Sequence, residues 1–501
     1  MDEPKVPPTT LHREKTRLMV LWGTALAFAT KFGTILLSLL LARLIAPELY
    51  GQYGTVSTII LFAMSFSMQR FTENIFHKTP SFEDYHRHLA FGVFLHGILF
   101  LIVNTVAFVM AFNDELRNIT IYLHVGSFAI LLNVPRIVYV NYLQLGLRWQ
   151  KIRSLSILSF LTYAASAVTL AYLDLGVWAL LAQNLLVPLP YLVAFALDDR
   201  RLKGLNFNWR AYRDAFQFGV TRIGGAVAST AYSALESLTF SLALDFGALG
   251  VFNRARGLSQ LATSWLSEQV GSILYPSLAG LASRSDAARR TAGLLLRMTF
   301  WISGTAAIAV AAAPQAAVAV LYGANWGEVV PLVRPVLMLG LASSVLSVTS
   351  LVLLTNMGPR HVLALEVSVV SVNALGLILV IYAGAFAYAQ YLAAANLVML
   401  SAALVYMVRM GLFDRADVIR AVAPTILAAA LALACAATPA YVAAEKSWPL
   451  QTLLATATAS SLTMLALIRL LDPRGLETIL GLLPGGALAC RLLLLRPRNG
   501  A

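Results

Sequence analysis

The first apolar run of the chain, residues 18–44, constrains the fold more than any other feature. At about 1.5 Å per helical residue, it is long enough to cross a hydrocarbon core of about 30 Å. Lys31 interrupts the run at a depth where a cation costs about 3 kcal/mol, so it should face protein or water. The run lacks a cleavage-type ending, which predicts a retained first span. Pro47 and Gly51 then predict the end of the helix and a tight reversal.

The rest of the chain has the same character. Its 501 residues are 59% hydrophobic and 12% charged, and the mean hydropathy is +0.74. Soluble proteins are about 25% charged, so these values predict an all-α polytopic membrane protein. We expect about fourteen spans, covering residues 18–44, 53–76, 89–112, 119–143, 154–173, 176–197, 214–242, 249–281, 291–313, 331–356, 361–383, 386–410, 421–443 and 449–471.

Lysines and arginines gather at the N-terminus and in every second connection between these segments, whereas the alternate connections are poor in cations. Cytoplasmic loops carry such an excess, so both termini are predicted to lie in the cytoplasm. The net charge of +13 therefore indicates membrane topology rather than a nucleic-acid partner. The apolar tail around Pro484 is interpreted as an interfacial or re-entrant piece, with a fifteenth span as the alternative.

A short internal repeat divides the chain. LARLIAPELYGQY at 41–53 matches LALDFGALGVF at 242–252 if two residues are dropped, so that Gly51 corresponds to Gly250. Six expected spans separate the copies, which makes the two halves parallel repeats. We therefore expect the following order: a cytoplasmic segment (1–17), a six-helix lobe (18–198), a cytoplasmic connector (199–213), a second six-helix lobe (214–410), two added helices (411–473) and a cytoplasmic or interfacial tail (474–501).

Four stretches carry a resemblance to a known family: LARLIAPELYGQYG at 41–54, ALGVFNRARGLSQL at 248–261, ILYPSLAGL at 273–281 and LYGANWGEVVPLVR at 321–334. In this order they resemble the polysaccharide-biosynthesis family of oligosaccharide flippases (Wzx-type), which shares a superfamily with MATE exporters and lipid II flippases. The chain departs from the common pattern at Arg70 and Glu73, where the family is often apolar or small.

The resemblance implies two six-helix, MATE-like lobes around a central cavity, plus two added helices, in the bacterial inner membrane. The implied activity is flipping of a polyprenyl-pyrophosphate-linked oligosaccharide for exopolysaccharide, capsule or O-antigen assembly. The implied partners are this substrate, membrane lipids, and the polymerase and chain-length proteins of the same pathway.

Buried cations are the candidate residues for binding an anionic substrate. Lys31 and Arg222 are expected to attract the pyrophosphate. The alternative for both is snorkelling to the interface. A further alternative for Lys31 is an ion pair with a carboxylate such as Glu236. Further candidates for binding the substrate are Arg70, Arg254 and Arg256. The alternative for Arg70 is an ion pair with Glu73, and the alternative for Arg254 and Arg256 is anchoring at the membrane interface. Candidates for ion coupling or charge balance are Glu73, Glu236 and Glu268. We interpret Arg136, Glu268 and Glu366 as mainly structural residues near an interface.

Nothing in the sequence predicts catalysis, a cofactor or a metal site. It holds no GxxxxGK[ST], HExxH or GxSxG motif, and Cys435 and Cys490 have no ligand spacing. An ion-coupled, MATE-type exporter of small organic cations is the alternative function, but it would want acidic groups in its cavity. A glycosyl polymerase or ligase would need a large outer loop, and the expected outer loops are short.

Overall fold

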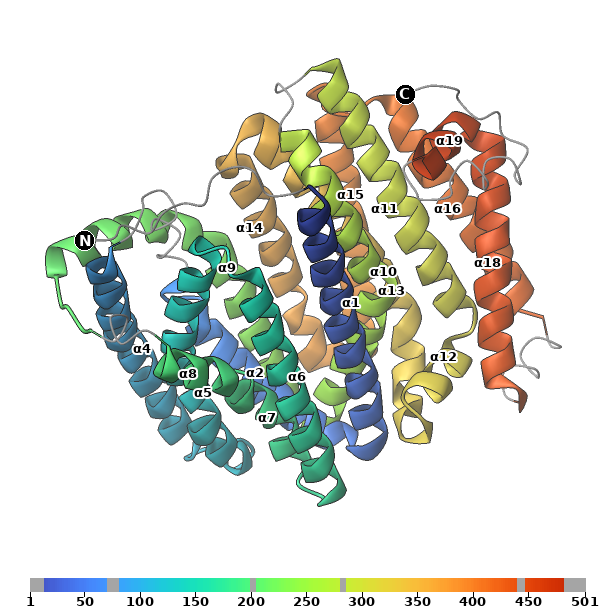
Figure 1. Cartoon of the computed structure of the whole chain (residues 1–501). Helices are drawn as coiled ribbons and strands as arrows, with labels where there is room; N and C mark the ends of the chain where they lie inside the picture. Colours follow the sequence, from blue (N-terminus) through green and yellow to red (C-terminus); the bar gives the residue numbers. More distant parts are fainter. Residues whose placement is uncertain (1–12, 70–80, 199–203, 280–284, 439–446, 482–501) are drawn as a thin grey trace. The chain divides into compact units, whose positions relative to one another are not determined.

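The computed structural model describes residues 13–69, 81–198, 204–279, 285–438 and 447–481, and these residues form helices without a strand. They fall into two compact units, 1–230 and 231–501, and the division lies within one long helix, α9 (Trp209–Ala243). The expectation of an all-α membrane protein is therefore confirmed (Figure 1). The finer boundaries proposed from the sequence stay predictions.

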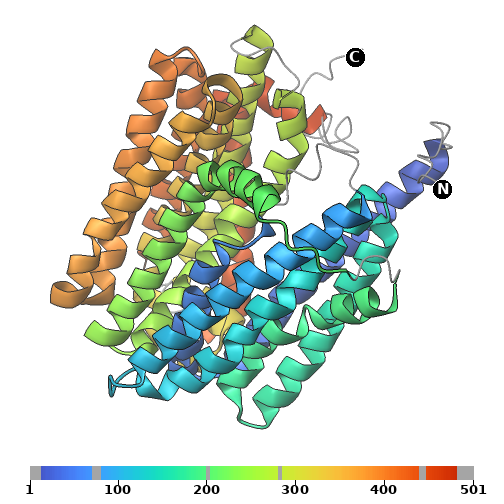
Figure 2. The same cartoon turned by 90° about the vertical axis from the view of Figure 1, so that its left-hand side faces the viewer.

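The first unit is a bundle of apolar helices that run alongside one another (Figure 2, dark blue to teal). α4 packs against α5, and α6 packs against both α1 and α7. Its elements are α1 (Arg13–Leu44), α2 (Pro47–Met64), α4 (Phe82–Met110), η2 (Arg117–Ile119), α5 (Thr120–Leu145), α6 (Trp149–Tyr172), α7 (Gly176–Leu186) and α8 (Leu189–Leu197), followed by the start of α9.

The reversal expected at Pro47 and Gly51 is wrong in detail. Pro47 begins α2 instead of ending a helix, with Ala46 as an extended N-cap. Proline suits the first helical position, because its fixed φ fits the helix and its missing N–H would have no partner there. The chain therefore reverses around Ile45 and Ala46, and Gly51 is a buried residue inside α2. The second helix also starts before the expected residue 53 and ends at Met64; residues 70–76 of that expected span lie outside the described residues.

The second unit continues with α10 to α15 (Figure 1). Gly384, which lies between the expected spans 361–383 and 386–410, has a φ of 78°, so the turn that these spans require is confirmed, inside the stretch from Leu377 to Arg409. Gly250 is buried in the second turn of α10, the place that Gly51 has in α2. The elements are α10 (Phe246–Ala279), α11 (Asp286–Ala312), α12 (Pro314–Leu321), η4 (Ala324–Val329), α13 (Val330–Met357), α14 (Pro359–Leu375) and α15 (Leu377–Arg409).

Three more helices, α16 (Arg415–Ala436), α18 (Pro449–Leu471) and α19 (Pro473–Gly481), pack onto α11. Buried ion pairs join them to it: Arg297 Nη1 lies 2.6 Å from Asp472 Oδ2, and Arg297 Nη2 lies 3.6 Å from Asp417 Oδ1. Apolar side chains such as Leu296, Phe300 and Met464 form the core around these pairs. The helices that follow the internal repeat are therefore an integral part of the second unit.

Within the described ranges, nine helical segments are long and apolar enough to cross a membrane. This makes the chain a multi-pass membrane protein, while the expected number of about fourteen spans is not established. One expected span, residues 176–197, is interrupted where the sequence supplies a reason. Pro188 and Pro190 separate α7 from α8, because proline cannot continue the hydrogen-bond ladder.

Candidate functional site

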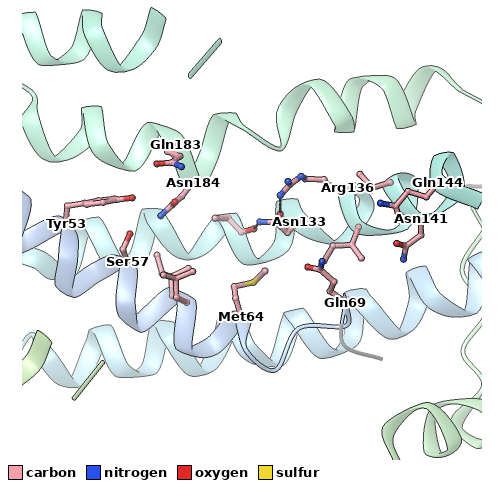
Figure 3. Close-up of a pocket in the computed structure, with 15 residues that line it drawn as sticks. Tyr53, Ser57, Met64, Gln69, Asn133, Arg136, Asn141, Gln144, Gln183 and Asn184 are labelled. Carbon is pink, nitrogen blue, oxygen red and sulfur yellow. Dashed lines mark hydrogen bonds between the residues drawn. The ribbon is translucent and has the colours of Figure 1, made fainter. Parts of the chain in front are cut away.

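The first unit contains a polar cavity of about 440 Å³ between α2, α5, α7 and the turn that follows α2 (Figure 3). Its size falls in the range of about 300–1,000 Å³ that is usual for small-molecule sites. Apolar side chains such as Ile60, Met64 and Ile137 complete the wall. The polar lining residues are Tyr53, Ser57, Gln69, Asn133, Arg136, Asn141, Gln144, Gln183 and Asn184.

α5 supplies more of these polar residues than any other helix. Asn133, Arg136, Val140 and Gln144 follow one another at intervals of three or four residues, which places them on the same side of a helix. In a lipid-facing helix such groups would be costly, so their periodicity indicates a surface turned to protein or water. The sequence holds this signal, but reasoning from single charges classed Arg136 as structural. The structure instead places it in the wall of the cavity.

Arg136 is held without a carboxylate. Its Nη1 donates to Asn133 Oδ1 at 2.8 Å, and its guanidinium carbon lies 5.4 Å from the centre of the Tyr191 ring. No acidic side chain in the described ranges pairs with it, and its buried Nε has no hydrogen-bond acceptor there. Asn141, only 8% exposed, likewise has a buried Nδ2 without an acceptor. Within the described residues, the lining of the cavity therefore carries a positive charge without a carboxylate partner.

The turn after α2 is fixed by a fully buried histidine of α4. His96 Nε2 accepts a hydrogen bond from the Met68 backbone N–H at 3.2 Å and lies 3.0 Å from Ser67 Oγ. Because Nε2 is an acceptor, the proton lies on Nδ1, which donates to the Ile130 carbonyl at 2.7 Å. These contacts join α4 and α5 to the turn, and Gln69 of that turn lines the cavity.

The second unit contains a different arrangement of charge. Glu236 of α9 is 2% exposed, and its carboxylate receives both terminal nitrogens of Arg256 of α10, at 2.7 and 2.8 Å. The Tyr232 and Tyr388 hydroxyls donate to Glu236 Oε1 at 2.9 and 2.6 Å. We call these four residues the Glu236 cluster. The structure thus brings together two residues that the sequence had singled out separately.

Arg254, two residues before Arg256, lies in an aromatic setting. Its guanidinium carbon lies 5.8 Å from the ring centres of both Tyr322 and Trp326, and its carbonyl accepts a hydrogen bond from the Tyr322 hydroxyl at 3.2 Å. Trp326 is fully buried. These contacts attach α10 to the segment between α12 and α13, and they leave the expected role of Arg254 in substrate binding a prediction.

Of the remaining expected site residues, only Lys31 has a described side chain, and it is not among the described lining residues of the cavity. Lys31 is exposed on α1 and has no carboxylate partner among the described side chains. Gly33, which packs against Phe160 of α6, is about 200° around the helix from Lys31. Arg222 and Glu268 belong to α9 and α10, but their side chains lie outside the described part, as do Arg70 and Glu73 altogether. Their expected roles stay predictions.

These observations define a class: a helical multi-pass membrane protein with a polar cavity among its helices, lined by a cationic side chain. A family model described as "Polysaccharide biosynthesis protein" matches residues 40–331, and the chain belongs to this family. The resemblance read from the sequence is thereby confirmed. A search of the curated proteins finds none that matches the sequence.

Two solved structures show the same fold. One is the lipid II flippase MurJ in an inward closed conformation, with a TM-score of 0.67 and 11% identity over 90% of this chain and 99% of that one. The other is an inward-facing multidrug resistance MATE family transporter of the MOP superfamily, with a TM-score of 0.56 and 15% identity over 76% of this chain and 94% of that one. At these identities the likeness concerns the fold.

Proposed function

We propose that the protein is a flippase that moves a polyprenyl-pyrophosphate-linked oligosaccharide across the bacterial inner membrane by alternating access. The polymer served is exopolysaccharide, capsule or O-antigen, and both chain termini face the cytoplasm. Membership in a polysaccharide biosynthesis family and the fold shared with a lipid II flippase support this assignment. The polymerase and chain-length proteins of the pathway are its expected partners.

The observation that carries the proposal is the sign of the charge in the cavity. Arg136 is cationic, and none of the fifteen lining residues that the structure describes is Asp or Glu. A positive site inside an apolar bundle attracts an anion and repels an organic cation. The alternative of a small-cation exporter, which the fold of the MATE transporter also suits, is disfavoured by this charge.

Transport in this direction needs no ATP site. A pyrophosphate that leaves the cytoplasm moves with an inside-negative potential, which contributes about 2.3 kcal/mol per unpaired charge at 100 mV. Lys31 and Arg222 remain the proposed contacts of the pyrophosphate. Positive side chains along the path lower the cost of bringing phosphate through the apolar interior.

The proposal is tested by deleting the gene in its host. We expect loss of surface polymer and accumulation of the lipid-linked oligosaccharide, with both restored by the wild-type chain. Complementation with Lys31→Ala and Arg222→Ala, at matched protein levels, then tests the two pyrophosphate contacts. Normal polymer export without the chain would contradict the proposal, and resistance to organic cations conferred by the chain would favour the exporter.

A further inference from the structure

We propose that the cavity of the first unit is a sugar site, in which amide side chains bind hydroxyl groups and Arg136 binds one acidic substituent. This inference rests on the proposed function, because it names the part of the transported molecule that the cavity receives. It concerns the glycan. Of the residues proposed for the pyrophosphate, Lys31 is not among the described lining residues, and the side chain of Arg222 lies outside the described part.

The lining has the chemistry that a sugar needs. Asn133, Asn141, Gln144, Gln183 and Asn184 each carry an amide with two donor hydrogens and an acceptor oxygen. A sugar presents neighbouring hydroxyl groups that both donate and accept, so several amides around one cavity can satisfy them in a way that a purely cationic phosphate site cannot. Figure 3 shows these side chains approaching the cavity from more than one helix.

The charge of Arg136 indicates what else the occupant brings. Arg136 lines the cavity, and no described carboxylate pairs with its guanidinium. A cation in this setting favours a ligand that carries an anionic group. A carboxylate balances the charge of Arg136 and forms a charge-assisted contact with it.

The geometry also limits the size of the occupant. A cavity of about 440 Å³ holds a sugar or two, not a whole oligosaccharide. His96 and Gly92 fix the turn that carries Gln69, since a Cβ at position 92 would collide with Met68 Sδ and lie 2.8 Å from Val134 Cγ1. The site is therefore formed before the ligand arrives, which favours selection among sugars.

Binding is measured on the full-length chain in lipid nanodiscs by saturation-transfer NMR, which detects weak ligands. The probes are methyl β-glucuronide, methyl β-glucoside and inorganic pyrophosphate. We expect the glucuronide to bind about tenfold more tightly than the glucoside, the difference that one charge-assisted contact makes. Absence of binding by both sugars would overturn the proposal. The proposal would also be overturned if pyrophosphate displaced the glucuronide at a concentration lower than that of the glucuronide itself. Arg136 would then bind the phosphates of the linker.

Variants assign the signal to the cavity. Arg136→Gln should remove the preference for the glucuronide but keep the binding of the glucoside, and Arg136→Lys should restore part of the preference. Asn141→Leu should weaken both sugars. Arg334→Gln, an exposed arginine of the second unit, is the matched control and should change nothing. Equal glucuronide affinity in wild type and Arg136→Gln would contradict the inference, provided that both elute as folded protein in size-exclusion chromatography.

The same variants separate this inference from the proposed function. If cells without the chain make normal polymer, the proposed function fails. If the chain is required but Arg136→Gln and Asn141→Leu export polymer at the wild-type rate, only the sugar site fails. A selective loss of acidic polymer in Arg136→Gln, with neutral polymer still exported, would support both.

Discussion

Two arginines, one in each unit, show opposite ways of placing a cation among apolar helices. Arg256 in the Glu236 cluster has a carboxylate on both terminal nitrogens and two tyrosine hydroxyls on the same carboxylate. Arg136 in the cavity has one amide oxygen and one aromatic ring, and its Nε is unpartnered in the described part of the chain. The first charge is neutralised by a buried carboxylate, whereas no described carboxylate neutralises the second.

The difference teaches how to separate structural from functional charge in such a bundle. The electrostatic field of a paired ion is largely cancelled by its partner. Removal of one ion of the pair mainly leaves the other as an unpaired charge in an apolar environment. An unpaired cation contributes little to stability and can even reduce it, so its retention is better explained by what it binds. Substitutions in both places can break or sharpen this comparison.

The largest effect is expected from Glu236→Leu. Arg256 would then be left without its carboxylate, and breaking a buried pair in this way costs about 3–5 kcal/mol. The double variant Glu236→Leu with Arg256→Met should recover most of the loss, because no unpaired charge remains. Thermal unfolding in one detergent measures both. A single variant as stable as wild type would show that the cluster is not a closed pair.

A smaller loss, of about 3 kcal/mol, is expected from His96→Leu. Leucine fills the space but leaves the Met68 N–H and the Ile130 carbonyl without their present partner. His361→Leu is the control, since His361 is exposed and should change stability by about 0.5 kcal/mol or less. Equal unfolding temperatures for the two variants would contradict the role of His96 in fixing the turn.

Gly92→Ala tests the same turn by overpacking. The added methyl group would meet Met68 and Val134, for an expected loss of about 1–3 kcal/mol. Gly97→Ala on the same helix α4 has no atom within 4 Å of the new Cβ. It should be neutral or slightly stabilising, because alanine favours the helix more than glycine. The prediction fails if the two variants unfold at the same temperature.

The smallest effect on stability is expected from Arg136→Gln, at about 1 kcal/mol or less in either direction. The change removes one hydrogen bond to Asn133 but also an uncompensated charge. The same substitution at Arg256 should be much more destabilising, since it leaves the nearly inaccessible Glu236 unpaired. Similar losses at the two positions, measured by thermal unfolding, would remove the distinction on which the comparison is built.

The sequence predicted the helical membrane fold because long apolar runs admit few alternatives in a bilayer. It also predicted the turn at Gly384, where a positive φ favours glycine. It was wrong at Pro47, because a proline signals either the end or the start of a helix, and only the neighbouring packing decides which.

The candidate site was harder to predict. The sequence offers Glu236 as a partner for Lys31 or as a residue for ion coupling or charge balance. Its observed partner Arg256 lies on the next helix, α10, where the hairpin brings the two side chains together. The sequence shows Arg136 as a single charge in an apolar segment. It indicates a cavity only when it is considered together with the other polar residues on the same face of α5.

The sequence by itself determined which segments lie in the membrane and which lie in water. The free energies of transferring the side chains from water to lipid add up along a segment, so composition alone decides its location. What only the tertiary structure decided is which buried charge is paired. That depends on contacts between helices, such as those of Arg256 with Glu236 and Tyr388, which no spacing within one helix encodes. Among the described residues, the same packing leaves Arg136 hydrogen-bonded to Asn133 in the wall of the cavity and without a carboxylate.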